Sequence, residues 1–183
     1  MGATESTRSD RELVDAVLLK KDETAFRELY RRHTPRLFAL VGRLLARGDH
    51  EAEDVVQEIW VHAFESLPNF QWGSSFSTWL TGVGLNRVRD RIRKYARSRE
   101  SAVEHVPEVA VESASHEDRV DLERMIARLP DEQRMVLVLH DVEGMKHREI
   151  AGYLEIPEGT SKTLLSNARQ RVREMMARKG EWI

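Results

Sequence analysis

The spacing of apolar residues constrains the fold of this chain more than any other feature. Across most of its 183 residues they recur every three or four positions, as in EAEDVVQEIWVHAFESL (51–67). Strict alternation of apolar and polar residues, which indicates a half-buried strand, is scarce. Recurrence at three and four positions places apolar side chains on one face of a helix. We therefore predict an all-α fold built from amphipathic helices.

Capping residues and breakers divide this pattern into separate helices. Ser9 or Asp10 suits the start of the first, Pro35 a first turn, and Gly144 a helix end. The segment LPNFQWGSS, 67–75, is rich in turn-forming residues and predicts a loop. The expected helices are 10–19, 23–33, 35–48, 49–66, 76–99, 118–128, 131–142, 147–154 and 158–178.

An acidic segment separates two helical modules. SAVEHVPEVAVESASHED, 101–118, is small, acidic and weakly periodic, and it contains a proline. That composition is typical of a flexible linker. We therefore expect two small helical domains, 1–100 and 118–183, joined by a flexible linker over 101–117.

The net charge of −2 conceals strongly charged blocks. Seven Lys or Arg lie between positions 87 and 99 against one acid, Asp90, and six lie between 162 and 179 against Glu174. Seven acids lie between 104 and 123 against Arg119. One such run is as often a solvated helix face as a binding surface. Two basic runs, each in an amphipathic helix, favour a nucleic-acid partner.

The segment REIAGYLEIPEGTSKTLLSNARQRVRE, 148–174, has the pattern of a helix-turn-helix. Ala151 allows two helices to cross closely, and Pro157 and Gly159 bracket a sharp connection before a basic helix. In this motif the second helix enters the major groove of DNA. An ordinary helical hairpin with a solvated face is the alternative.

The two halves of that second helix differ in chemistry. We expect its buried stripe to contain Leu165, Ala168, Val172 and Met176, with Ser161 in the same sector. The other half carries donors and almost no acid, which suits contacts to phosphates and base edges. We expect base contacts from Lys162, Thr163 and Ser166 and phosphate contacts from Arg169, Arg171 and Arg173.

The predicted helix 76–99 combines a cationic face with neighbouring aromatic residues. Its expected apolar stripe is Leu85, Val88, Ile92 and Ala96. Basic residues beside aromatic ones suit single-stranded nucleic acid, because charge follows the backbone and rings hold unstacked bases. Phe76 and Trp79 have core spacing, whereas exposure and burial are equally expected for Trp72.

Helix 49–66 has an acidic face opposite its apolar one. Its apolar face consists of Ala52, Val55, Val56, Ile59, Trp60 and Ala63. An acidic face with an apolar Val61 would repel phosphates and suits a basic protein surface, although most acidic faces only bind water.

Taken together, these segments resemble the extracytoplasmic-function (ECF) sigma factors, small members of the sigma-70 family. EAEDVVQEIWVHAFESLPNF resembles region 2.2, SSFSTWLTGVGLNRVRDRIRK resembles regions 2.3 and 2.4, and the segment from Leu129 to Glu174 resembles region 4. The resemblance covers roughly 10–100 and 118–178. It implies a factor that binds core RNA polymerase at the β′ clamp and β flap, directs it to the −10 and −35 promoter elements, and assists promoter melting. It also implies an anti-sigma factor as a regulatory partner.

The resemblance implies a role for specific residues. Binding to core polymerase is implied for Asp54, Gln57, Glu58 and Val61. Binding to the −10 element is implied for the loop 69–75 and the following helix, at Phe70, Gln71, Trp72, Ser75, Asn86, Arg87, Asp90, Arg93 and Arg97. Binding to the −35 element is implied for Thr160, Lys162, Thr163, Ser166, Arg169, Gln170, Arg171 and Arg173.

Four positions depart from the family pattern. Lys146 stands where a capping Ser is usual, and Glu155 replaces a turn Gly. Ser161 places a small polar side chain in the buried stripe and so reduces its apolar surface. Leu164 replaces an Arg that often lies near DNA. We expect the mode of −35 binding to be kept, with changed affinity and sequence preference.

Other function classes fit the sequence poorly. The chain has no cysteine, which excludes disulfides, thiolate metal sites and Cys nucleophiles, and its seven His follow no ligand spacing. We expect no enzymatic activity, no cofactor and no metal. No membrane-length apolar stretch or signal peptide is found, so we expect a cytoplasmic protein, held at the membrane only through an anti-sigma factor. A sigma-like protein that only sequesters regulators remains an alternative, and a stand-alone repressor would leave 1–100 unexplained.

Overall fold

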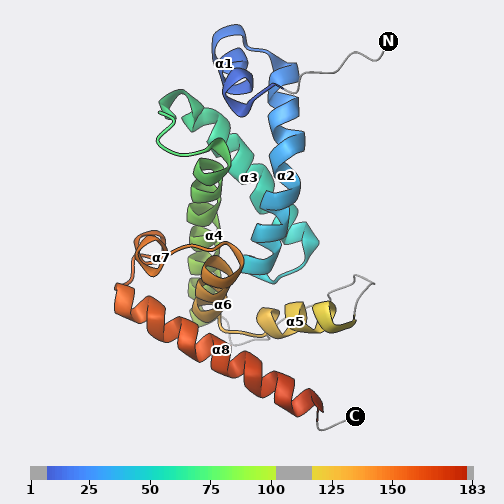
Figure 1. Cartoon of the computed structure of the whole chain (residues 1–183), viewed down its shortest axis with the longest axis vertical. Helices are drawn as coiled ribbons and strands as arrows, with labels where there is room; N and C mark the ends of the chain where they lie inside the picture. Colours follow the sequence, from blue (N-terminus) through green and yellow to red (C-terminus); the bar gives the residue numbers. More distant parts are fainter. Residues whose placement is uncertain (1–7, 102–116, 181–183) are drawn as a thin grey trace.

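The computed structural model describes the backbone of residues 8–101 and 117–180, and the side chains of 8–97 and 121–178. Within these ranges the regular elements are helical and no strand occurs, which confirms the predicted all-α class (Figure 1). We call 8–101 the N-terminal module and 117–180 the C-terminal module. The predicted linker lies almost wholly outside the described residues and stays a prediction.

The N-terminal module contains α1 (Asp10–Lys20), α2 (Glu23–Leu45), α3 (Asp49–Ser66), the short η1 (Leu67–Asn69) and α4 (Phe76–Ser101). Ser9 begins α1 with a capping box: its hydroxyl accepts from the Glu12 N–H at 3.3 Å and its own N–H donates to the Glu12 carboxylate at 2.7 Å. The Asp22 carboxylate accepts from two N–H groups in the first turn of α2. The predicted starts of these two helices are confirmed.

The predicted break at Pro35 is wrong, because 23–33 and 35–48 belong to one helix, α2, which contains the proline. A proline inside a helix removes one backbone donor and costs about 3 kcal/mol. Leu29, Leu37 and Val41 are buried on one face on both sides of the proline. Their shared burial offsets the local cost, so packing keeps the helix continuous.

The core of the N-terminal module lies where α3 packs against α2 and α4. The six predicted apolar residues of α3 are all buried. On α4, Leu85, Val88 and Ile92 are buried as predicted, but Ala96 is exposed. The reason is the length of α3: its first turn already lies beside Arg91, so α4 extends past α3 before Ala96.

The C-terminal module contains α5 (Glu117–Ala127), α6 (Asp131–Leu137), the π-helical η2 (Val138–Val142), α7 (His147–Leu154) and α8 (Glu158–Gly180). Gly144, with a φ of 70°, ends the predicted helix 131–142 as expected. On α8, Ser161, Leu165 and Ala168 are buried, but Met176 is exposed. Val172 is half-buried against the core, so the predicted stripe is covered as far as Val172 and loses its last member.

The two modules pack against one another, the C-terminal one lying along the ends of α2 and α4 (Figure 1). Arg134 of α6 is 3% exposed, and its guanidinium donates to the carbonyls of Leu44 and Leu45 at 2.9 and 3.1 Å. Those carbonyls lie at the end of α2, where a helix lacks internal donors. We call this packing of the C-terminal module on α2 and α4 the closed arrangement.

Ion pairs and one close approach complete the closed arrangement. Arg43 of α2 contacts Glu123 of α5, and Arg36 contacts Glu143, each at 2.9 Å. The Tyr153 hydroxyl of α7 lies so close to α4 that a Cβ added at Gly82 would be 2.9 Å from it. The modules therefore meet through specific polar contacts as well as apolar ones.

Replacing Arg134 with Met should lower the free energy of unfolding by roughly 1–3 kcal/mol, because the Leu44 and Leu45 carbonyls would lose a buried donor. Urea denaturation followed by circular dichroism measures the change. Arg178→Met, at an exposed position of α8, is the matched control and should change little. Equal stability of the two variants would contradict a structural role for the buried guanidinium.

Candidate protein and nucleic-acid interfaces

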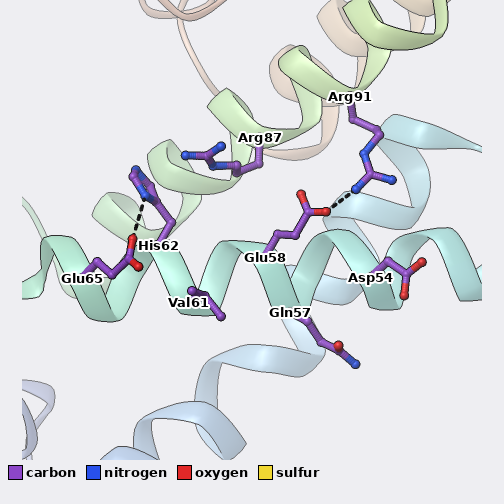
Figure 2. Close-up of a pocket in the computed structure, with 8 residues that line it drawn as sticks. All are labelled: Asp54, Gln57, Glu58, Val61, His62, Glu65, Arg87 and Arg91. Carbon is purple, nitrogen blue, oxygen red and sulfur yellow. Dashed lines mark hydrogen bonds and ion pairs between the residues drawn. The ribbon is translucent and has the colours of Figure 1, made fainter.

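The predicted protein-binding residues gather on one exposed strip of α3. Asp54, Gln57, Glu58 and Val61 follow helical spacing and are all exposed, Val61 to 61%. They line an open groove of about 580 Å³ between α3 and α4, which His62 and Glu65 of α3 also border (Figure 2). The structure thus brings the four residues together, as the sequence predicted.

The groove has one acidic side and one basic side. Arg91 of α4 reaches across it to Glu58 (Figure 2). Arg91 also contacts Glu51 at 2.5 Å. Asp54 and Gln57 border the groove without contacting α4 (Figure 2), and they pair with no other described residue. The outer edge of α3 therefore keeps an unneutralised carboxylate and an amide next to apolar Val61, which suits a basic, partly apolar protein surface.

An aromatic stack supports the loop between η1 and α4. The Phe70 ring lies 4.7 Å from that of Trp72 and stacks on that of Trp79 at 4.9 Å. Phe76 is buried, as its spacing predicted, while Trp72 is half-buried against the core. Trp72 has a φ of 58°, a left-handed conformation that is uncommon for a bulky residue.

The remaining loop residues are exposed or have local roles. Gln71 is exposed. The Ser75 hydroxyl accepts from the Thr78 N–H at 3.1 Å and so caps α4. The loop thus places one free amide side chain beside a rigid aromatic support.

The cationic face of α4 is partly occupied by the C-terminal module. Asn86, Asp90 and Arg97 are exposed, and Arg87 borders the α3–α4 groove. Arg93, however, pairs with Glu155 at 3.0 Å. A hydrogen bond from Arg93, together with the charges of Arg89 and Arg93, lowers the pKa of Glu155.

Arg89 is a residue that the sequence analysis missed. Its guanidinium donates to the Tyr153 carbonyl and to the Glu155 carboxylate, each at 2.8 Å. Its position four residues after buried Leu85 was the available signal, since a cation beside an apolar stripe needs a partner. The C-terminal module supplies that partner.

All eight predicted DNA-binding residues of α8 are exposed. Lys162 pairs with Glu158 at 2.7 Å, and the Arg169 guanidinium contacts both oxygens of Asp141 at 3.0 and 2.6 Å. The hydrogen bond from Arg169 lowers the pKa of Asp141. Asp141 therefore fixes the direction of Arg169, a contact that helix periodicity could not predict.

The unusual residues of the helix-turn-helix have local explanations. Glu155 adopts a left-handed conformation, φ 57°, as expected where the family has Gly. Lys146 gives no side-chain cap, but its N–H donates to the Glu149 carboxylate at 2.8 Å. Buried Ser161 lies 2.9 Å from Nδ1 of His147, so its hydroxyl has a polar partner, and Leu164 is half-buried.

No group of three or more His, Asp or Glu is placed to hold a metal ion in the described part of the chain. None of its helices combines the length and apolarity needed to cross a bilayer.

The comparisons with known proteins cover both modules. The family models of sigma-70 region 2 and sigma-70 region 4 match residues 29–98 and 119–172. The chain is 32% identical over 169 residues to the ECF RNA polymerase sigma factor SigM of Mycobacterium tuberculosis H37Rv. That match covers 92% of this chain and 85% of SigM. It is 29% identical over 180 residues to the ECF RNA polymerase sigma-E factor of Escherichia coli K12, spanning 88% of this chain and 93% of that protein.

Two solved structures share the fold. RpoE of Bartonella quintana, in complex with the anti-sigma factor NepR, superposes with a TM-score of 0.68 at 25% identity, over 83% of this chain and 96% of that one. CnrH, in complex with the cytosolic domain of CnrY, superposes with a TM-score of 0.57 at 26% identity, and the match covers 92% of this chain and 97% of that one. From these matches and the paired helical modules, the chain belongs to the extracytoplasmic-function family of RNA polymerase sigma factors, which act in transcription initiation.

Proposed function

We propose that three separate surfaces of this sigma factor bind different partners during initiation, and that the factor itself catalyses no reaction. The acidic strip of α3 docks on core polymerase. The 69–75 loop and the cationic face of α4 bind the opened −10 element, within a domain over 1–100. The exposed face of α8 reads the −35 element, within a domain over 118–183.

The α3 strip carries this proposal, because three of its four residues, Asp54, Gln57 and Val61, have no structural role within the described chain. Asp54 and Gln57 pair with no other described residue, and Val61 exposes most of its surface to water. Acids flanking an exposed apolar residue favour a basic, amphipathic helical partner. The clamp of the β′ subunit is the partner that the family resemblance implies.

The DNA-binding surfaces differ in the form of DNA that they suit. The loop offers a half-buried aromatic stack and leads into the cationic helix α4, and this combination favours unstacked bases. The first turns of α8 present Thr160, Lys162 and Thr163 to solvent, at the end of a helix that normally reaches base edges. One surface is therefore suited to a melted strand and the other to a duplex.

The closed arrangement sets a condition on promoter binding. Glu155 occupies Arg89 and Arg93 on α4, and a carboxylate at that position repels phosphates. Two DNA elements read by different modules also need those modules to be spaced along the duplex. We infer that the modules separate when polymerase and promoter bind. Because RpoE and CnrH are seen with NepR and CnrY, we propose an anti-sigma factor as the partner that opposes this step.

Replacing Asp54 with Lys should weaken assembly with core polymerase at least about tenfold, because the basic partner would meet a cation. Titration of labelled factor into core enzyme measures the affinity. Glu53→Lys makes the same charge change one residue away on α3 and should retain assembly. The proposal fails if the two variants behave alike. Run-off transcription with the wild-type factor tests the alternative, since a protein that only sequesters regulators would assemble without initiating.

Replacing Glu155 with Gln should strengthen binding of the free protein to duplex DNA by about two- to tenfold, because Arg89 and Arg93 would lose their carboxylate. Fluorescence anisotropy at a fixed, low salt concentration measures it. Glu132→Gln removes the same charge from an exposed position of the C-terminal module and serves as the control. An equal gain in both variants would show a general charge effect and refute specific masking of α4.

A further inference from the structure

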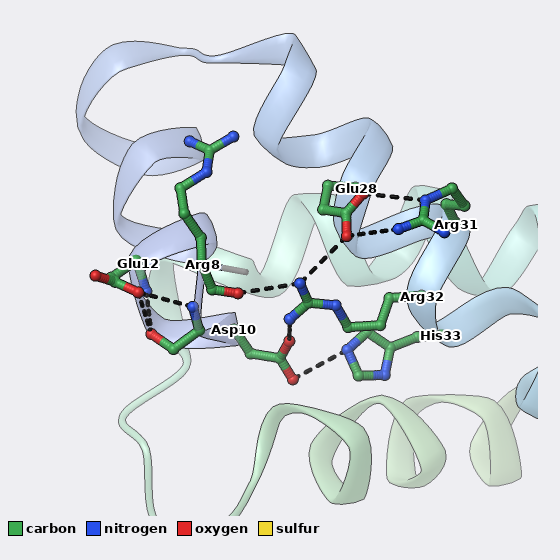
Figure 3. A network of polar contacts seen from close by, with 8 residues as sticks. Arg8, Asp10, Glu12, Glu28, Arg31, Arg32 and His33 are labelled. Carbon is green, nitrogen blue, oxygen red and sulfur yellow. Dashed lines mark hydrogen bonds and ion pairs between the residues drawn. The ribbon is translucent and has the colours of Figure 1, made fainter. Parts of the chain in front are cut away.

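A polar network fixes the start of α1 on α2 (Figure 3). The Asp10 carboxylate accepts from the Arg32 guanidinium at 2.6 Å and lies 3.0 Å from Nε2 of His33. Arg32 also donates to the Arg8 carbonyl at 3.0 Å. About a quarter of the Asp10 and Arg32 side chains is exposed, so water competes weakly for these bonds. The first turn of α1 is therefore held in one orientation.

This orientation brings α1 next to the loop between η1 and α4, residues 70–75, which we call the −10 loop. Arg11 follows Asp10 directly, and its guanidinium carbon lies 5.5 Å from the centre of the Trp72 ring. A guanidinium within about 6 Å of an aromatic ring is attracted to the ring face. Arg11 is exposed and forms no ion pair with another described residue. Its contact with Trp72 is thus its one specific interaction in the described part of the chain.

Trp72 needs such support. Its left-handed backbone is strained for a bulky side chain and persists only where surrounding contacts hold it. Phe70 packs against the Trp72 ring from within the loop, at 4.7 Å. Arg11 adds a contact from a different element, one that is tied to α2 and does not move with the loop.

We propose that Arg11 is a positioning residue for base recognition in the −10 loop: from the fixed first turn of α1, it holds Trp72 in the conformation that discriminates the unstacked base. This inference rests on the proposed −10 function of the loop. It extends the recognition surface to a helix that is remote in sequence from that loop.

The role differs from a phosphate contact in a measurable way. A phosphate contact contributes equally to every sequence, so its loss weakens binding uniformly. A positioning residue acts on the shape of the base site, so its loss reduces the ratio between affinities for the preferred base and for others. An exposed arginine on a helix surface contributes little to stability, so Arg11→Ala is expected to fold.

The first measurement follows Trp72 directly. Acrylamide quenching of tryptophan fluorescence in the free protein should rise in Arg11→Ala, because the ring would be less restrained. The same substitution made in a Trp72→Phe background should have no effect. A rise that persists in that background, or no rise at all, contradicts the contact.

The second measurement uses single-stranded DNA. Wild-type factor bound to core polymerase selects oligonucleotides from a random pool, and affinities are then measured for the selected strand and its single-base substitutions. Arg11→Ala should reduce discrimination at the most selective base at least about threefold, and Arg11→Lys should restore part of it. Lys20→Ala, the same charge change at the far end of α1, is the control and should keep full discrimination.

The outcomes separate this inference from the function it rests on. If wild-type holoenzyme discriminates and Arg11→Ala discriminates equally well, the role of Arg11 is refuted while the −10 function stands. A uniform loss of affinity with intact discrimination refutes it too, in favour of a phosphate contact. If wild-type holoenzyme binds all strands equally, both the −10 role of the loop and this inference are wrong.

Discussion

The buried guanidinium of Arg134 is the interaction on which the rest of the arrangement depends. The last carbonyls of a helix lack internal donors, and Arg134 supplies them to α2 from the other module. Asp131 pairs with the Arg134 charge within the C-terminal module, and the two α2 carbonyls complete its hydrogen bonds, so the position of the C-terminal module on α2 is specified by buried hydrogen bonds. This position of the C-terminal module places the turn after α7 over α4, where Glu155 forms ion pairs with Arg89 and Arg93.

The consequence is an asymmetry between the surfaces of this sigma factor. The outer edge of α3 stays open to a protein partner, whereas part of the cationic face of α4 is paired with a carboxylate of the same chain. If the proposed roles of these surfaces hold, polymerase can be bound in the closed arrangement, whereas promoter DNA has to compete with Glu155. Surface ion pairs are individually weak, so displacing Glu155 from Arg89 and Arg93 needs only modest energy, whereas separating the modules also breaks the buried Arg134 bonds to α2. The chain thereby favours assembly with polymerase before engagement of DNA.

The sequence predicts most of the helices and the exposed faces, because periodicity and capping are local properties. The six buried residues of α3 and the Ser9 start of α1 follow from them directly. Where tertiary packing decides, prediction fails: α2 continues through Pro35, and Met176 and Ala96 lie beyond the helices that would cover them. Contacts such as that of Arg89 with Glu155, or of Arg11 with Trp72, join positions about 60 residues apart and leave no mark in local spacing.

The separation of the modules is the central claim, and the distance between them tests it most directly. The natural chain has no cysteine, so spin labels can be attached to Glu53→Cys and Ala177→Cys alone and their distance measured by electron paramagnetic resonance. We expect one narrow, short distance distribution in the free protein. We expect a clearly longer distance when core polymerase and a promoter fragment chosen by the wild-type holoenzyme are bound. The same distribution in both states would contradict the separation of the modules.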